Sequence, residues 1–130
     1  MNDRSTTILE LKEAVRQMCI DKGWGVEGKQ DPQHVAMAFN VEAAELLEQF
    51  QWLSEAQVKR LADGGDPVRQ GCIAEEFADC MMYGLQLMYT LGIDVSSEIE
   101  KKIERVMHRP EDYSQKKEQM RDAFEREIRQ

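Results

Sequence analysis

The sequence predicts an all-α fold, a bundle of the four-helix type. Apolar residues recur at intervals of three and four through several long segments, no segment alternates as a strand would, and the three prolines fall between segments. The 130 residues, 42% of them hydrophobic and 32% charged, suffice for one domain with its own core. We therefore expect a helical domain over residues 1–110, followed by a charged helical tail over 111–130.

Glycines and two Asp-Pro pairs mark where the first helices begin and end. The first helix is expected over Thr6–Lys22, before the glycine-rich loop at residues 23–28. The second follows Asp31-Pro32, because aspartate caps helices and proline is favoured at the first helical position. A short helix is expected at residues 54–62, before a break at 63–67.

Two further helices and a charged tail are expected in the second half of the chain. A long helix is expected over Val68–Leu91, and another from Ser96 or Ser97 until near Pro110. The tail at 111–130 is either a solvated helix or one that contacts a neighbouring subunit. We expect an oligomer, because apolar residues nearly encircle the long helix. These residues are Met81, Met82, Leu85, Leu87, Met88 and Tyr89.

Composition excludes several classes of partner. The net charge of −8 argues against binding to the phosphate backbone of a nucleic acid polymer. Without an opening signal peptide or an apolar run of about 18 residues, the sequence predicts a cytoplasmic protein with no membrane contact. Cys19, Cys72 and Cys80 lie in apolar helical segments, which is typical of buried, reduced thiols.

Two of the predicted helices each carry a pair of acids three residues apart, Glu42 with Glu45 and Glu76 with Asp79. Residues at this spacing project from one side of a helix. Both pairs lie among residues expected to be buried, and a buried carboxylate requires a cation, hydrogen bonds or a proton. Facing each other, the four acids would form a cage for Mg²⁺; a solvated helix face is the alternative for either pair.

Aromatic residues extend both acidic stripes. Trp52 continues the stripe of the second helix, and Tyr83 continues that of the long helix. Their flat faces suit a nucleobase whose phosphates are held by the metal, and ordinary core packing is the alternative. His34 and His108 lie outside any Glu-x-x-His pair, which argues against a di-iron carboxylate bundle.

Residues 42–52, E-A-A-E-L-L-E-Q-F-Q-W, and residues 75–79, E-E-F-A-D, followed by Tyr83, resemble a known superfamily. It is the all-α nucleoside triphosphate pyrophosphohydrolases, which include the MazG-like proteins and the dCTP pyrophosphatases. The resemblance covers roughly residues 22–110, including Asp31-Pro32. It implies a homodimer or homotetramer that hydrolyses (deoxy)nucleoside triphosphates to monophosphate and pyrophosphate, a house-cleaning reaction of the nucleotide pool. A non-catalytic nucleotide-sensing or partner-binding module of the same fold is the alternative.

The resemblance also implies roles for individual residues. Glu42, Glu45, Glu76 and Asp79 would hold Mg²⁺, or Mn²⁺ in its place. Glu45 or Glu42 would orient or deprotonate the attacking water, with Glu48 and Glu75 as flanking candidates. The residues expected to bind substrate are Trp52, Tyr83, Trp24, Gln30, Lys102 and Arg105.

The sequence departs from the family pattern at two of these positions. Gln30 stands where pyrimidine-selective relatives tend to carry a histidine, which leaves base selectivity open. Arg105 stands near a position where relatives carry an asparagine. Its guanidinium could contact phosphate, or it could pair with Glu98 or Glu104 on the surface.

Overall fold

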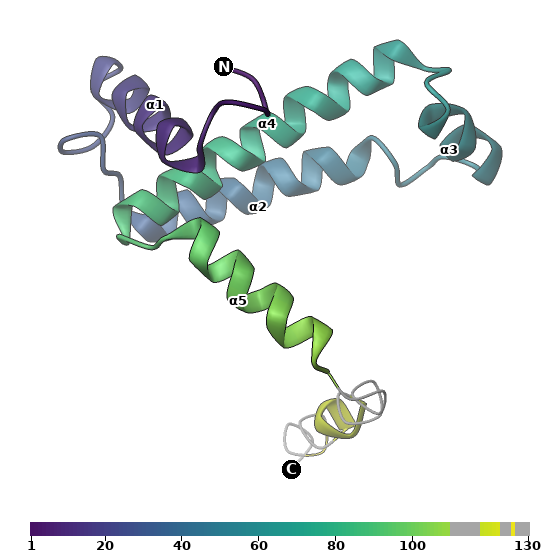
Figure 1. Cartoon of the computed structure of the whole chain (residues 1–130). Helices are drawn as coiled ribbons and strands as arrows, with labels where there is room; N and C mark the ends of the chain where they lie inside the picture. Colours follow the sequence, from purple (N-terminus) through teal and green to yellow (C-terminus); the bar gives the residue numbers. More distant parts are fainter. Residues whose placement is uncertain (110–117, 123–125, 127–130) are drawn as a thin grey trace. The chain divides into compact units, whose positions relative to one another are not determined.

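The computed structural model describes residues 1–109, 118–122 and 126, and its architecture is all-α (Figure 1). The named helices are α1 (Ile8–Asp21), α2 (Pro32–Glu48), α3 (Glu55–Ala62), α4 (Pro67–Thr90) and α5 (Val95–Met107). Within these described ranges there is no β-strand, which confirms the predicted fold class. In the same ranges, no helix combines the length and apolar character that crossing a bilayer requires.

The chain divides into two units, residues 1–95 and residues 96–130. The first contains α1 to α4, and the second contains α5 after its first residue. α5 begins at Val95, one residue before the earlier of its two predicted starts, directly after Asp94. Most of the predicted tail helix at 111–130, including Phe124 and Ile128, lies outside the described residues; residues 118–122 are helical.

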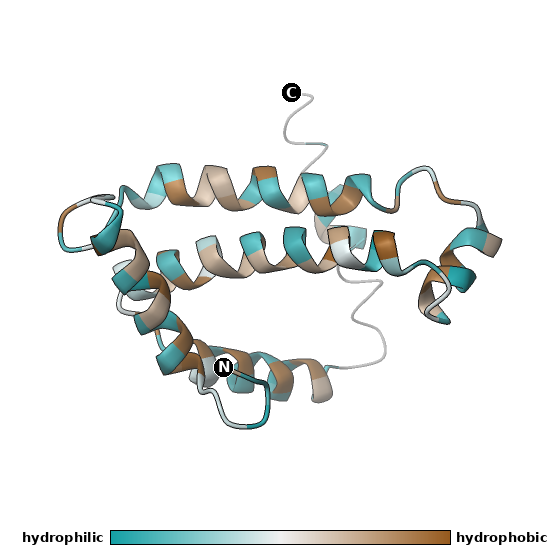
Figure 2. Ribbon diagram, turned by 90° about the horizontal axis from the view of Figure 1, so that it is seen from above, coloured by the Kyte–Doolittle hydropathy of each residue, from teal (hydrophilic) through white to brown (hydrophobic). Residues whose placement is uncertain are grey.

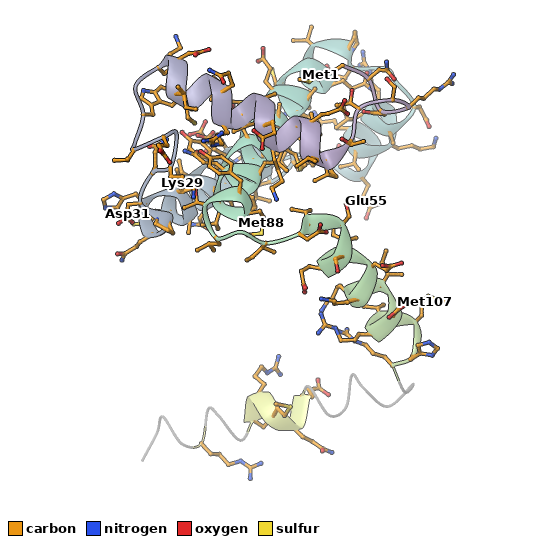
Figure 3. The ribbon with its side chains drawn as sticks, turned by 60° about the vertical axis from the view of Figure 1, so that its left-hand side comes forward. Met1, Lys29, Asp31, Glu55, Met88 and Met107 are labelled. Carbon is orange, nitrogen blue, oxygen red and sulfur yellow. The ribbon has the colours of Figure 1, made fainter. Side chains whose placement is uncertain are left out.

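Both Asp-Pro pairs start helices, as predicted. The Asp31 carboxylate accepts hydrogen bonds from the backbone N–H groups of Gln33 and His34, at 2.8 and 3.1 Å. Asp66 accepts one from the backbone N–H of Arg69 at 3.1 Å. These bonds satisfy donors that a helix leaves unpaired at its first turn. The labels Lys29 and Asp31 in Figure 3 mark the loop that leads into α2.

α4 ends in a glycine cap, directly after the predicted helix end at Leu91. Gly92 has a φ of 68°, a left-handed conformation that glycine adopts without steric cost. The backbone N–H of Ile93 donates to the Met88 carbonyl at 2.9 Å, and that of Gly92 donates to Tyr89 at 3.2 Å. This pair of bonds is the Schellman motif, which satisfies the last carbonyls of the helix.

Within the first unit, α4 packs against the other three helices. α2 runs antiparallel beside α4 for most of its length, as Figures 1 and 2 both show. The two backbones approach closely at Gly84, where an added Cβ would lie 3.3 Å from the Phe39 ring. Hydrophobic and hydrophilic residues are mixed along both helices (Figure 2), so each has faces of different character.

The core of the described chain is small. Its buried apolar residues are Val15, Cys19, Val35, Leu61, Cys80 and Leu85. The apolar spacing that predicts the second and the long helix also predicts core positions for Leu47, Phe77 and Leu91, but these residues are 58%, 56% and 52% exposed. The prediction was wrong there because Leu47 and Phe77 lie on faces of α2 and α4 that no other described helix of the unit covers, and Leu91 is the C-cap residue that follows α4. Cys19 and Cys80 are buried free thiols as predicted, whereas Cys72 is half-buried.

Candidate metal centre

The antiparallel contact of α2 and α4 brings the predicted acids together. One carboxylate oxygen from each of Glu42, Glu45 and Glu76 lies within 4.8 Å of the others. Two of these acids come from adjacent turns of α2 and the third comes from the facing side of α4. Oxygens this close are within reach of a shared hard cation, which requires only small shifts of the side chains.

Asp79 adjoins this group without belonging to the closest three. It is half-buried, one turn beyond Glu76 on α4, and its charge contributes to raising the pKa of both Glu42 and Glu76. The structure therefore places all four predicted acids in one electrostatic cluster. We call Glu42, Glu45, Glu76 and Asp79 the acid cluster.

Like charges perturb the acid cluster. Partial burial is the largest cause that raises the pKa of Glu42 above that of an ordinary carboxyl group, followed by the charges of Glu45, Asp79 and Glu76. The pKa of Glu76 is raised in the same way, by burial and then by Glu45 and Asp79. Ion pairs elsewhere in the described chain join Arg16 to Glu13, Lys59 to Asp63, Arg69 to Asp66 and Lys101 to Glu98. None of these pairs, in the part of the chain that is described, neutralises the acid cluster.

The expectation that both acid pairs have buried surroundings is only partly met. Glu42, Glu76 and Asp79 are half-buried, but Glu45 is exposed, and so are its neighbours Ala44 and Leu47. The cluster therefore lies at the edge of the α2–α4 contact and is open to solvent. An open edge admits a ligand from solvent, which a sealed core would not.

Cys80 lies directly behind the acids on α4. Its thiol is 7% exposed, and burial together with the charge of Glu42 raises its pKa. A raised pKa keeps the free thiol protonated at neutral pH, which disfavours Cys80 as a nucleophile. The three grouped donors of the site are carboxylate oxygens, and this set suits Mg²⁺ or Mn²⁺ better than a soft metal.

The remaining predicted site residues occupy different surroundings. Glu48 and Glu75 are exposed and close enough to the acid cluster to raise the pKa of Glu76. Tyr83 is half-buried, one turn of α4 beyond Asp79. Trp52 follows the end of α2 and is 85% exposed, so ordinary core packing does not explain it.

Four further candidates lie outside α2 and α4. Trp24 is 47% exposed and Gln30 is half-buried, both in the segment between α1 and α2. Lys102 and Arg105 are exposed residues of α5 and belong to the second unit of the chain. The acids and these candidates therefore come from separate parts of the sequence.

Comparison with known proteins assigns the chain to a family. The sequence pattern of the MazG-like family matches residues 37–122, which include the whole acid cluster. The chain belongs to the MazG-like family. No curated protein sequence matches it significantly.

A solved structure supports this assignment of the MazG-like chain. It is a pyrophosphatase from Archaeoglobus fulgidus DSM 4304, determined by crystallography. The two share 25% sequence identity and superpose with a TM-score of 0.65, over 85% of this chain and 99% of the other. The all-α arrangement is thus shared with a pyrophosphatase over nearly its entire length.

Sequence reasoning missed one residue near the acid cluster of this MazG-like protein. The Arg69 guanidinium donates from its terminal nitrogen Nη1 to the backbone carbonyl of Gln49 at 2.7 Å, which links the start of α4 to the end of α2. A signal was available, because Arg69 is the one lysine or arginine within the residue ranges of α2 and α4.

Proposed function

We propose that this MazG-like protein hydrolyses (deoxy)nucleoside triphosphates to the monophosphate and pyrophosphate, with Mg²⁺ or Mn²⁺ bound by the acid cluster. The observation that carries the proposal is the convergence of the carboxylates of Glu42, Glu45 and Glu76 within 4.8 Å. The structural similarity to a pyrophosphatase supports the same class of reaction.

The chemistry of the acid cluster fits a divalent cation. Its donors are hard carboxylate oxygens, and their mutual repulsion, visible in the raised pKa values of Glu42 and Glu76, is relieved by a positive charge. When bound, the cation neutralises phosphate charge and polarises a water molecule.

The protein's own acids would manage the proton of the attacking water. Among the three grouped acids Glu42, Glu45 and Glu76, Glu45 is the exposed one, so its carboxylate is accessible to water. Glu45 is therefore our first candidate for the base, and Glu42 is the second. Glu48 and Glu75 are exposed neighbours and remain alternative bases.

Substrate recognition would combine aromatic and basic residues. Trp52 presents most of its indole to solvent and is the first candidate to stack on the base, with Tyr83, Trp24 and Gln30 completing the contacts. The phosphates need cations that α2 and α4 do not supply, because their single arginine already binds a backbone carbonyl. The family resemblance suggests Lys102 and Arg105, exposed residues of α5, for this role.

We further propose that the active form is a homodimer or homotetramer. Large apolar side chains on α2 and α4 are left uncovered by the single chain. Exposed apolar surface of this kind is typical of subunit contacts. The residues concerned are Met37 (62% exposed), Phe39 (41%), Val41 (53%), Leu47 (58%) and Phe77 (56%).

The decisive experiment measures pyrophosphate release from a panel of nucleoside triphosphates, with and without Mg²⁺. Glu45→Gln and Asp79→Asn keep the side-chain shape but remove ligand charge, so turnover should fall by about 100-fold or more. Glu13→Gln is the matched control, an exposed α1 acid expected to retain full turnover. Near wild-type turnover in both acid variants would exclude the proposed cage. Nucleotide binding without any pyrophosphate release would favour a non-catalytic sensing module.

A further inference from the structure

We propose that Arg69 is a positioning residue for the acid cluster, which holds α2 at the axial register that brings Glu45 beside Glu76. The inference rests on the proposed metal site. Arg69 lies in the first turn of α4, and its Nη1 donates to the carbonyl of Gln49 at 2.7 Å. Gln49 is the C-cap residue of α2, so this bond connects the two helices at one end of their contact.

The bond lies on the same side of both helices as the acids. Arg69 and Glu76 are seven residues apart, which is almost two full turns, and so they share one face of α4. Gln49 follows Glu45 by four residues, about 6 Å along α2 at 1.5 Å per residue. Arg69 therefore acts one helical turn of α2 away from the acid cluster, within the same interhelical contact.

The guanidinium is itself held in place. Its Nε lies 3.6 Å from the Asp66 carboxylate, whose other oxygen caps α4 by accepting from the Arg69 backbone N–H at 3.1 Å. The side chain is only 34% exposed. A planar guanidinium with one edge toward a carboxylate and another toward a carbonyl has little freedom to rotate. The Gln49 carbonyl, which needs a partner beyond its helix, receives a charge-assisted hydrogen bond.

The acid cluster needs such a restraint because its charges push α2 and α4 apart. Each of the two helices carries three acids, and Arg69 is their one lysine or arginine. The charges that shift the pKa values of Glu42 and Glu76 are all carboxylates, so Arg69 acts through the backbone of α2 and not by neutralising the acids. A slip by one residue would move α2 by about 1.5 Å, far more than metal–oxygen bonds of roughly 2.0–2.1 Å tolerate.

The test measures Mn²⁺ affinity of the full chain from the electron paramagnetic resonance signal of free Mn²⁺. Arg69→Met keeps the aliphatic stem and removes the donors, and binding should weaken about tenfold, the lower end for lost supporting contacts around metal ligands. Arg60→Met is the matched control. Its Nε makes the same kind of bond, to the Gly65 carbonyl at 2.9 Å, beyond the end of α3, and Mn²⁺ affinity should be unchanged.

Asp66→Asn keeps a capping side chain but removes the charge that orients Arg69, so it should weaken Mn²⁺ binding in the same direction and by less. If Arg69→Met does not fold, Asp66→Asn replaces it as the test variant. A merely structural Arg69 would lower the melting temperature equally with and without Mn²⁺, whereas a positioning residue diminishes the rise that Mn²⁺ produces.

Wild-type Mn²⁺ affinity in Arg69→Met, or in Asp66→Asn where that variant carries the test, overturns the inference. A wild-type protein that binds no Mn²⁺ overturns the metal site and the role of Arg69 together. If the wild type binds Mn²⁺ and Arg69→Met weakens it, but no triphosphate is hydrolysed, the inference stands and the proposed function fails.

Discussion

α4 packs against two helices in two different ways. Its contact with α1 is closed and neutral: Cys19 is fully buried, Gln86 is 3% exposed, and the Gln86 amide donates to the Cys19 sulfur at 3.5 Å. Its contact with α2 contains the acid cluster, in which like charges face each other at an open edge. The α1 contact pairs a buried amide with a buried thiol, whereas the α2 contact brings together like charges that a cation or a proton would compensate.

This difference separates stability from ligand binding along a single helix. A satisfied buried pair adds to the free energy of folding, whereas facing carboxylates reduce it until a cation or proton arrives. Substitutions along the α1 contact should therefore change stability and leave activity alone. Substitutions along the α2 contact and just beyond it should change activity, and neutralising one of its acids should also raise stability when no cation is bound.

Trp52 offers the largest expected effect on substrate binding. Base stacking is worth about 1–3 kcal/mol, so Trp52→Ala should raise KM roughly 5- to 150-fold and reduce kcat less. Because the indole is 85% exposed, the melting temperature should hardly change. KM and kcat are measured by steady-state kinetics on each hydrolysed triphosphate, and the melting temperature is measured in parallel. An unaltered KM for every substrate would move base recognition to another residue, with Trp24 the next candidate.

Gln86 should show the opposite pattern. Gln86→Ala removes a buried amide and leaves a cavity beside Cys19, which should lower the free energy of unfolding by about 1–3 kcal/mol. Gln17→Ala is the control, since the Gln17 amide is exposed and bonds only within α1, to Asp21 at 2.8 Å. Urea denaturation gives the stabilities. If Gln86→Ala lost turnover per folded molecule, the separation of the two contacts would be wrong.

Local spacing sufficed to predict the features that depend on one helix at a time. The Asp-Pro starts, the glycine cap of α4 and the pairing of acids at three-residue intervals follow from capping chemistry and helical periodicity. The acid pairs left two alternatives open, a cage between facing helices and a solvated helix face, and the structure has α2 and α4 facing each other.

Features that depend on which helix covers which face could not be predicted in this way. Phe77 and Leu47 have the spacing of core residues and are nevertheless exposed, because an apolar face has the same pattern whether or not a partner covers it. The bond from Arg69 to the Gln49 carbonyl joins residues 20 apart in sequence, and a backbone acceptor has no sequence signature.

The smallest expected effect is a pH dependence of stability that arises at the α2 contact. The pKa of Glu76 is raised above the ordinary value of 4.5, mainly by partial burial and then by Glu45 and Asp79. The folded state therefore binds this proton more tightly than the unfolded state does. The stabilisation is fully present below pH 4.5 and is lost as pH rises through the raised pKa.

Glu76→Gln isolates this contribution, because the amide stays neutral at every pH. In metal-free buffer with a chelator, the variant should melt above the wild type at neutral pH, and the difference should shrink as pH falls through the raised pKa, because protonation neutralises the wild-type carboxyl. Mg²⁺ should then stabilise the wild type and leave the variant much less affected. Gln17→Ala on α1, which removes no ionisable group, is the control and should show no such trend. If the difference in melting temperature between Glu76→Gln and wild type stayed constant with pH, repulsion in the acid cluster would not limit stability. The contrast between the two contacts of α4 would then rest on metal binding alone.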